Sequence, residues 1–179
     1  MNDRQRNMPN SSLSKSTCLA GLQCIRRLWL QVNEPQRYQP PVHGSLMDVG
    51  QKIGRKGRLL FPNGVLIDEE PWNHAQAAAR TRALMEDARV PAIFEGAFEF
   101  DGIRIRVNVL ERLAKGTWGL REVKSSAGPK DHHYDDIAIQ LHVLSGIGIA
   151  LSSIELVHVN SAYVRGELDP IRGTTGRWI

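Results

Sequence analysis

The chain of 179 residues has little cysteine and no long apolar run, and each shortage excludes a class of protein. Its two cysteines, Cys18 and Cys24, are too few for a disulfide framework, so we expect a reducing compartment. The most apolar segment, 141–151, is interrupted by polar and glycine residues and is too short to span a bilayer. Residues 1–12 are polar and lack the apolar stretch of a signal peptide. We therefore expect a cytoplasmic protein with no membrane partner.

The fraction of charged residues is ordinary, and basic residues slightly outnumber acidic ones. Hydrophobic residues make up 41% of the chain and charged residues 23%, a balance typical of globular proteins. The formal net charge of +4 favours an anionic partner such as nucleic acid. The basic residues form short clusters rather than one run, at 26–27, 52–58, 104–106 and 124–130. Solvated surface charge explains the same clusters, so charge alone leaves both interpretations open.

The length and the pattern together indicate one domain between two tails. We expect a disordered tail over residues 1–12, a single domain over 13–168 and an irregular tail over 169–179. The last segment is rich in Gly, Arg and Thr and shows no periodicity, so a truncated chain is one interpretation of it.

Helical patterns fill the first part of the predicted domain. A first helix is expected to begin at a cap formed by Ser14 or Ser16. Its apolar residues are predicted to face the core, namely Leu19, Leu22, Leu28, Trp29 and Leu30. After a proline-containing loop, two more helices are expected over 48–60 and 73–88, the second capped by Asn73.

The pattern then changes to that of strands. Residues 92–100 alternate, and Asp101-Gly102 is a strong signal for a two-residue hairpin. In the return strand, we expect residues 103, 105, 107 and 109 on an apolar face and Arg104, Arg106 and Asn108 on the other. A third strand over 118–124 extends this to an antiparallel meander.

After the meander, the spacing becomes helical again. Tyr134, Ile137, Leu141 and Leu144 form one apolar stripe of a helix, and a strand follows over 154–159. The order of elements predicts an α/β fold in which one mixed sheet is flanked by helices.

Glu122 and Lys124 are the first candidates for chemistry. Residues two apart in a strand share a face, so the carboxylate and the amine are expected to lie together. A carboxylate can hold Mg²⁺ or Mn²⁺, and an ammonium can stabilise a phosphate. An exposed charge pair is the alternative interpretation, and this triplet alone favours that alternative.

Two amides strengthen the case for a site. Asn108 is on the polar face of the strand before Glu122, and Gln140 is on the apolar stripe of the following helix. A buried amide needs partners, because burial without a hydrogen bond is costly. We predict that Asn108, Glu122 and Lys124 share one pocket with Gln140 at its wall; a core amide bonded to a strand end is the alternative for Gln140.

Several blocks of sequence, in this order, resemble the nuclease core of the RecB-like branch of the PD-(D/E)XK superfamily, which includes CRISPR-associated exonucleases. The blocks are Phe94-Glu95-Gly96-Ala97-Phe98, Val107-Asn108-Val109-Leu110-Glu111, Arg121-Glu122-Val123-Lys124-Ser125-Ser126, and 130–140. The opening segment 13–30 and the segment 156–166 are similar to the same branch, in particular to an uncharacterised bacterial family within it. The resemblance implies a restriction-endonuclease-like fold, with a mixed central sheet flanked by helices.

The resemblance also implies roles for individual residues. Glu122 would ligate Mg²⁺ or Mn²⁺, Lys124 would position or activate the attacking water, and Gln140 would assist at the phosphate. Glu95 matches an acidic position of the family and would be an additional ligand. The implied activity is metal-dependent hydrolysis of DNA phosphodiesters. From the basic clusters, we expect Arg104, Arg106 and Lys130 to contact the DNA, and His132 to contact a phosphate or to be solvated.

The chain departs from the family at the position of the metal-binding aspartate, which is Asn108 here. An amide keeps one oxygen ligand but loses the negative charge, so affinity for a hard cation should fall. Relatives with an iron–sulfur cluster use four cysteines, so no cluster is expected. Two hypotheses follow, an impaired nuclease and an inactive nucleic-acid-binding module of the same fold. A structural or interaction domain whose Glu122 and Lys124 form a surface pair is the third.

Overall fold

The computed structural model describes residues 12–37 and 44–162. The tails predicted over 1–12 and 169–179 lie outside these ranges, except for Ser12. The helices are α1 (Lys15–Gln23), α2 (Ile25–Asn33), α3 (Gly44–Arg58), α4 (His74–Glu86) and α5 (Asp131–Gly146), with 3₁₀ turns η1 (Pro35–Arg37), η2 (Pro71–Asn73) and η3 (Ala114–Gly116). The strands are β1 (Leu13–Ser14), β2 (Val65–Leu66), β3 (Ala92–Phe100), β4 (Ile103–Arg112), β5 (Trp118–Lys124) and β6 (Leu151–His158).

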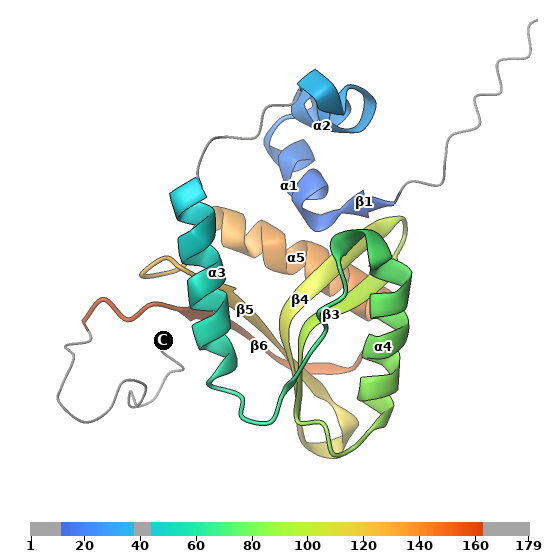
Figure 1. Cartoon of the computed structure of the whole chain (residues 1–179), viewed down its shortest axis with the longest axis vertical. Helices are drawn as coiled ribbons and strands as arrows, with labels where there is room; N and C mark the ends of the chain where they lie inside the picture. The colour runs from blue at the N-terminus through green and yellow to red at the C-terminus, as the bar shows by residue number, and fades with distance from the viewer. Residues whose placement is uncertain (1–11, 38–43, 163–179) are drawn as a thin grey trace, which may run out of the picture.

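One mixed sheet organises these elements (Figure 1). Its strand order is β2-β3-β4-β5-β6, and the short β1 pairs with β4 outside this path. The β3-β4-β5 meander is antiparallel, as predicted, whereas β2 pairs in parallel with β3 and β6 with β5. The α/β class with one mixed sheet flanked by helices is therefore confirmed.

The two faces of the sheet carry different cores. The larger core joins sheet residues such as Val107 and Leu120 to Ala77 of α4 and Val143 and Leu144 of α5. The smaller core lies on the other face and joins Phe61, which follows α3, to Phe94, Val109 and the partly buried Val123. Burial of this apolar area on both faces is the main stabilising term of the fold.

The hairpin between β3 and β4 turns where the sequence predicts it. Asp101 and Gly102 both have positive φ angles, 50° and 69°, as a two-residue hairpin of the primed type requires. A second positive φ, 56°, occurs inside β3 at Glu95, opposite Asn108. Val107 packs in the larger core but Val109 in the smaller one, so the alternation of β4 changes phase at Asn108. The prediction that 103, 105, 107 and 109 share one face is wrong for this reason.

The first predicted helix is two helices in the structure. Ser14 caps α1, because its side chain accepts a hydrogen bond from the Thr17 nitrogen, but the helix ends at Cys24 and α2 begins after it. No residue of α2 is buried, and Trp29 is half exposed, so the predicted core-facing side is wrong there. Asn73 is the N-cap residue of α4, as predicted, but its side chain makes no capping hydrogen bond, and the 3₁₀ turn η2 precedes the helix.

The buried stripe of α5 is more polar than predicted. Tyr134 is exposed, and the buried positions are His133, Asp136, Gln140, Val143 and Leu144. The second half of the helix covers the apolar core, whereas the first half contacts the polar end of β5. No helix in the described ranges has the length and apolar character needed to cross a membrane.

Candidate functional site

Five polar side chains from three elements meet at the end of β5. Glu122 and Lys124 come from the strand, Asp136 and Gln140 from α5, and Lys15 from the start of α1. Glu122, Asp136 and Gln140 are buried, while the two lysine side chains are about one-fifth exposed, 19% for Lys15 and 22% for Lys124. We call these residues the Glu122 cluster.

Hydrogen bonds and ion pairs connect every member of the cluster. Gln140 Nε2 donates to Glu122 Oε2 and to Asp136 Oδ1, at 2.9 Å in both cases. Lys124 Nζ lies 2.8 Å from Glu122 Oε1 and also pairs with Asp136 Oδ2. Lys15 Nζ lies 2.7 Å from Asp136 Oδ1 and 3.6 Å from Glu122 Oε1. Both carboxylates are thus shared between two ammonium groups and one amide.

Local structure explains how these side chains meet. Glu122 and Lys124 share a face of β5 because alternate residues of a strand point the same way. Asp136 and Gln140 are neighbours on α5 because residues four apart lie on one face of a helix. Lys15 arrives through tertiary structure, since β1 pairs with β4 and α1 packs against α5.

The charges of the cluster balance each other. Burial alone would lower the pKa of Lys124, but Glu122 and Asp136 outweigh it and raise that pKa above its ordinary value. Burial would raise the pKa of Asp136, but the Lys15 and Lys124 ammonium groups lower it below its ordinary value. The cluster thus sets two acidic side chains against two basic ones, and each acidic side chain pairs with both lysines.

The oxygen donors of the cluster fit a hard divalent cation in type. Glu122 and Asp136 offer carboxylate oxygens, and Gln140 Oε1 is buried without a hydrogen-bond partner in the described part of the chain. No three His, Cys, Asp or Glu side chains within the described ranges are grouped to hold a metal. Mg²⁺ is commonly held by only one or two carboxylates together with substrate phosphates, so two carboxylates are sufficient in number.

Asn108 and Glu95 do not belong to this cluster. Asn108 Oδ1 accepts a hydrogen bond of 3.0 Å from the backbone nitrogen of Val123. Asn108, Glu95 and Val123 line a separate hollow of about 420 Å³ beside α3, where Arg58 pairs with Glu95 at 3.3 Å. Within the described ranges no hydrogen bond or ion pair joins Asn108 to Glu122 or Lys124, so their single pocket stays a prediction.

The change of phase in β4 at Asn108 gives the reason for this placement. Val109 pairs with Arg121, and Leu110 pairs with Leu120. Glu122 consequently shares the face of Leu120, which packs in the larger core, while Val123 packs in the smaller core on the other face. The next position in this register sets Asn108 opposite Glu122, but the phase of β4 changes at Asn108, and its amide oxygen accepts from the Val123 nitrogen.

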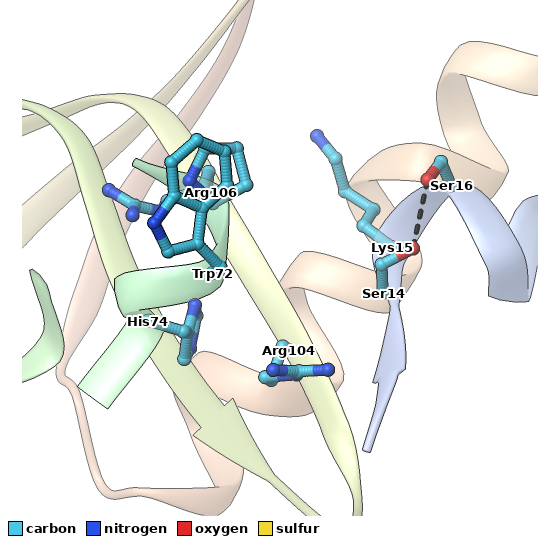
Figure 2. A pocket seen from close by; sticks show the side chains of 8 residues that line it. Ser14, Lys15, Ser16, Trp72, His74, Arg104 and Arg106 are labelled. Carbon is cyan, nitrogen blue, oxygen red and sulfur yellow. Dashed lines mark hydrogen bonds between the residues drawn. The ribbon is translucent and has the colours of Figure 1, made fainter. Parts of the chain in front are cut away.

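The residues predicted to contact nucleic acid fall into two places. Arg104 and Arg106 line a cavity of about 750 Å³ together with Lys15, Trp72 and His74 (Figure 2). Lys130 and His132 are exposed at the start of α5. Lys15 belongs to both the cavity and the Glu122 cluster, so the cavity with the two arginines adjoins the cluster.

Sequence reasoning missed two members of the cluster, Lys15 and Asp136. Asp136 had a usable signal, because it lies four residues before Gln140 and therefore on the same helix face. Lys15 had none, since only the packing of α1 against α5 brings it to the site. His133, which adjoins the predicted His132, is buried, and its Nδ1 accepts a hydrogen bond from the Lys130 nitrogen at the helix start.

Comparisons with known proteins add no relative to this description. No family model matches the chain, and no curated protein matches it.

Proposed function

We propose that the chain is a PD-(D/E)XK-type nuclease of the RecB-like branch, which hydrolyses DNA phosphodiesters with Mg²⁺ or Mn²⁺ and is impaired by Asn108. The observation that carries this proposal is the hydrogen-bonded set of Glu122, Lys124 and Gln140 at the end of β5. This set joins a carboxylate for a cation, an ammonium for a phosphate and an amide that fixes the carboxylate. The restriction-endonuclease-like fold is part of the same proposal.

Glu122 and Asp136 are the residues that would hold the cation in this account. Asp136 adds a carboxylate that the resemblance does not name, since it lies beside Glu122 and shares its Gln140 partner. The negative charge lost at Asn108 still lowers the affinity for the cation. A bound divalent cation supplies Lewis-acid stabilisation of the charge that develops on the phosphate. Lys15 has to leave Asp136 for this, since its ammonium already neutralises that carboxylate.

Lys124 acts as a cation in this mechanism rather than as a base. The neighbouring carboxylates raise its pKa, so the side chain stays protonated at neutral pH. A protonated amine cannot take a proton from water, but it can stabilise a phosphate oxygen through a charge-assisted hydrogen bond. Gln140 keeps Glu122 and Asp136 in place while the phosphate binds.

The second candidate function is a nucleic-acid-binding module without catalysis. Two observations favour it: the Asn108 amide is engaged with the Val123 nitrogen, and the two carboxylates of the Glu122 cluster are already neutralised by lysines. Such a module would keep the basic cavity of Arg104 and Arg106 and bind DNA without cutting it.

Binding and cleavage measurements distinguish the two candidates. Both predict DNA binding that weakens steeply with salt, because each neutralised phosphate releases counterions. Lys124→Ala and Arg106→Ala should each weaken that binding at low salt. Only the nuclease predicts metal-dependent cleavage that Glu122→Gln abolishes. If no DNA is bound at low ionic strength, both candidates fail and an interaction domain is the better account.

A further inference from the structure

The cavity beside the Glu122 cluster has features that the proposed cleavage reaction does not use. Its volume of about 750 Å³ falls within the range of small-molecule sites. Figure 2 shows the Trp72 indole and the Lys15 side chain on opposite walls, with His74 and Arg104 below them. The walls come from η2 and α4 on one side and from β1 and α1 on the other. No acidic residue of the described ranges lines it.

The positive charge of the cavity comes mainly from Arg104, since Lys15 pairs with Asp136, and Glu95 and Glu69 lie near Arg106. Arg104 donates from Nη2 to the Ser12 carbonyl at 3.0 Å, and within the described ranges it pairs with no carboxylate. Arg106 donates to the carbonyls of Glu95 and Glu69, at 3.1 and 3.0 Å. Carbonyl oxygens hold a guanidinium in position but do not cancel its charge. The cavity is therefore suited to an anion, and guanidinium groups bind phosphate oxygens well.

Trp72 adds an aromatic surface to this cationic cavity. It is 77% exposed, although an indole is among the most apolar surfaces that a side chain can present. Its backbone position is fixed, because Pro71 opens the 3₁₀ turn η2 and α4 follows directly. An exposed aromatic ring beside guanidinium groups is the arrangement with which proteins hold unpaired bases and their phosphates.

We propose that this cavity is a nucleotide subsite, in which the base of one unpaired nucleotide stacks on Trp72 and its phosphate is bound by Arg104. The inference rests on the proposed function and names the part of the DNA that lies next to the cluster. Lys15 connects the two places, since its side chain lines the cavity while its ammonium contacts Asp136. A nucleotide in the subsite therefore places the neighbouring phosphodiester beside Glu122 and Lys124.

Binding of two fluorescein-labelled probes tests the subsite, and EDTA keeps cleavage out of the measurement. One probe is a short oligothymidylate, and the other is an abasic strand of the same length with the same phosphates. The oligothymidylate should bind the protein about tenfold more tightly, and Trp72→Ala should remove this difference, because stacking on an aromatic side chain has that magnitude. Trp72→Phe should keep most of the difference.

Two further variants complete the test. Trp29→Ala is the matched control, since Trp29 is also exposed but lies on α2 away from the cavity. It should leave both affinities unchanged. Arg104→Gln should weaken both probes and lower the salt dependence by about one counterion. Circular dichroism melting checks that each variant is folded.

The outcomes separate the subsite from the proposed function. If the intact protein binds both probes equally, or if Trp72→Ala binds the oligothymidylate as well as the parent does, the subsite is wrong while DNA binding stands. If neither probe binds at low salt, the proposed function is wrong, and the subsite, which depends on it, is wrong as well.

Discussion

Lys15 places its ammonium 2.7 Å from a carboxylate oxygen of Asp136, although one residue opens α1 and the other lies in α5. This contact closes a cluster that already contains Glu122, Lys124 and Gln140. The Lys15 ammonium thereby occupies the carboxylate that a divalent metal would need as a ligand. The balance between this lysine and a metal is therefore the property on which the function depends.

Removing Lys15 should strengthen metal binding. Lys15→Gln leaves two carboxylates against one ammonium, and we expect Mn²⁺ to bind about fivefold more tightly, which corresponds to roughly 1 kcal/mol for one charge near the surface. Thermal unfolding over a Mn²⁺ titration measures this, because a ligand of the native state raises Tm. Lys52→Gln, an exposed lysine on α3, is the matched control. Identical Mn²⁺ responses of the two variants would show that Lys15 does not compete with the cation.

His74 should make the fold sensitive to mild acid. Burial, followed by the charges of Arg106 and Arg104, lowers the pKa of His74, while its contact with the Phe98 carbonyl and the charge of Glu99 oppose this. A lowered pKa in the folded state means that the unfolded chain takes up the proton first, near pH 6.5. Stability should therefore be complete above that pH and decline as the pH falls through the folded pKa.

Urea unfolding at pH 7 and pH 5 checks the role of His74. The parent should lose more free energy of unfolding between these two pH values than His74→Gln does, because glutamine does not titrate. His133 has a lowered pKa as well, through burial and then the charge of His132, so His133→Gln is measured in parallel. Equal losses in the parent and in His74→Gln would rule out His74 as the source.

The buried Arg121 should depend on its acidic partner. Arg121 is 2% exposed, and its Nη2 lies 2.8 Å from Glu111 Oε2. A side chain at position 119 would collide with this guanidinium, and the glycine there leaves the space that Arg121 occupies. Glu111→Gln should lower the free energy of unfolding by about 3 kcal/mol, since it leaves a buried cation short of its partner.

Chemical denaturation measures this cost, and a second substitution controls for it. Arg121→Met in the Glu111→Gln background removes the buried charge and should recover part of the lost stability. A Glu111→Gln protein as stable as the parent would mean that Glu155, 3.4 Å from the Arg121 Nε, suffices as a partner.

Local patterns predicted the parts of the site that lie within one element. The period of β5 put Glu122 and Lys124 on one face, and the helical stripe put Gln140 on the buried side of α5. Nothing local gives the change of phase in β4 opposite Glu95, so the face of Val109 was wrongly predicted. Lys15 was missed for a related reason, because helix packing between distant segments has no signal in either one.

The proposal that Asn108 impairs a nuclease is tested most directly by cleavage of labelled DNA with Mn²⁺ or Mg²⁺ and with chelator. Asn108→Asp can keep the hydrogen bond from the Val123 nitrogen on one oxygen and leave the second oxygen, with its charge, beside β5. The account predicts metal-dependent cleavage by Asn108→Asp at least about tenfold faster than by the parent, and none when Glu122→Gln or Lys124→Ala is added. Equal cleavage by the parent and Asn108→Asp, or cleavage that survives Glu122→Gln, would contradict the account. Absence of cleavage by folded Asn108→Asp that still binds DNA would also contradict it, in favour of the binding module.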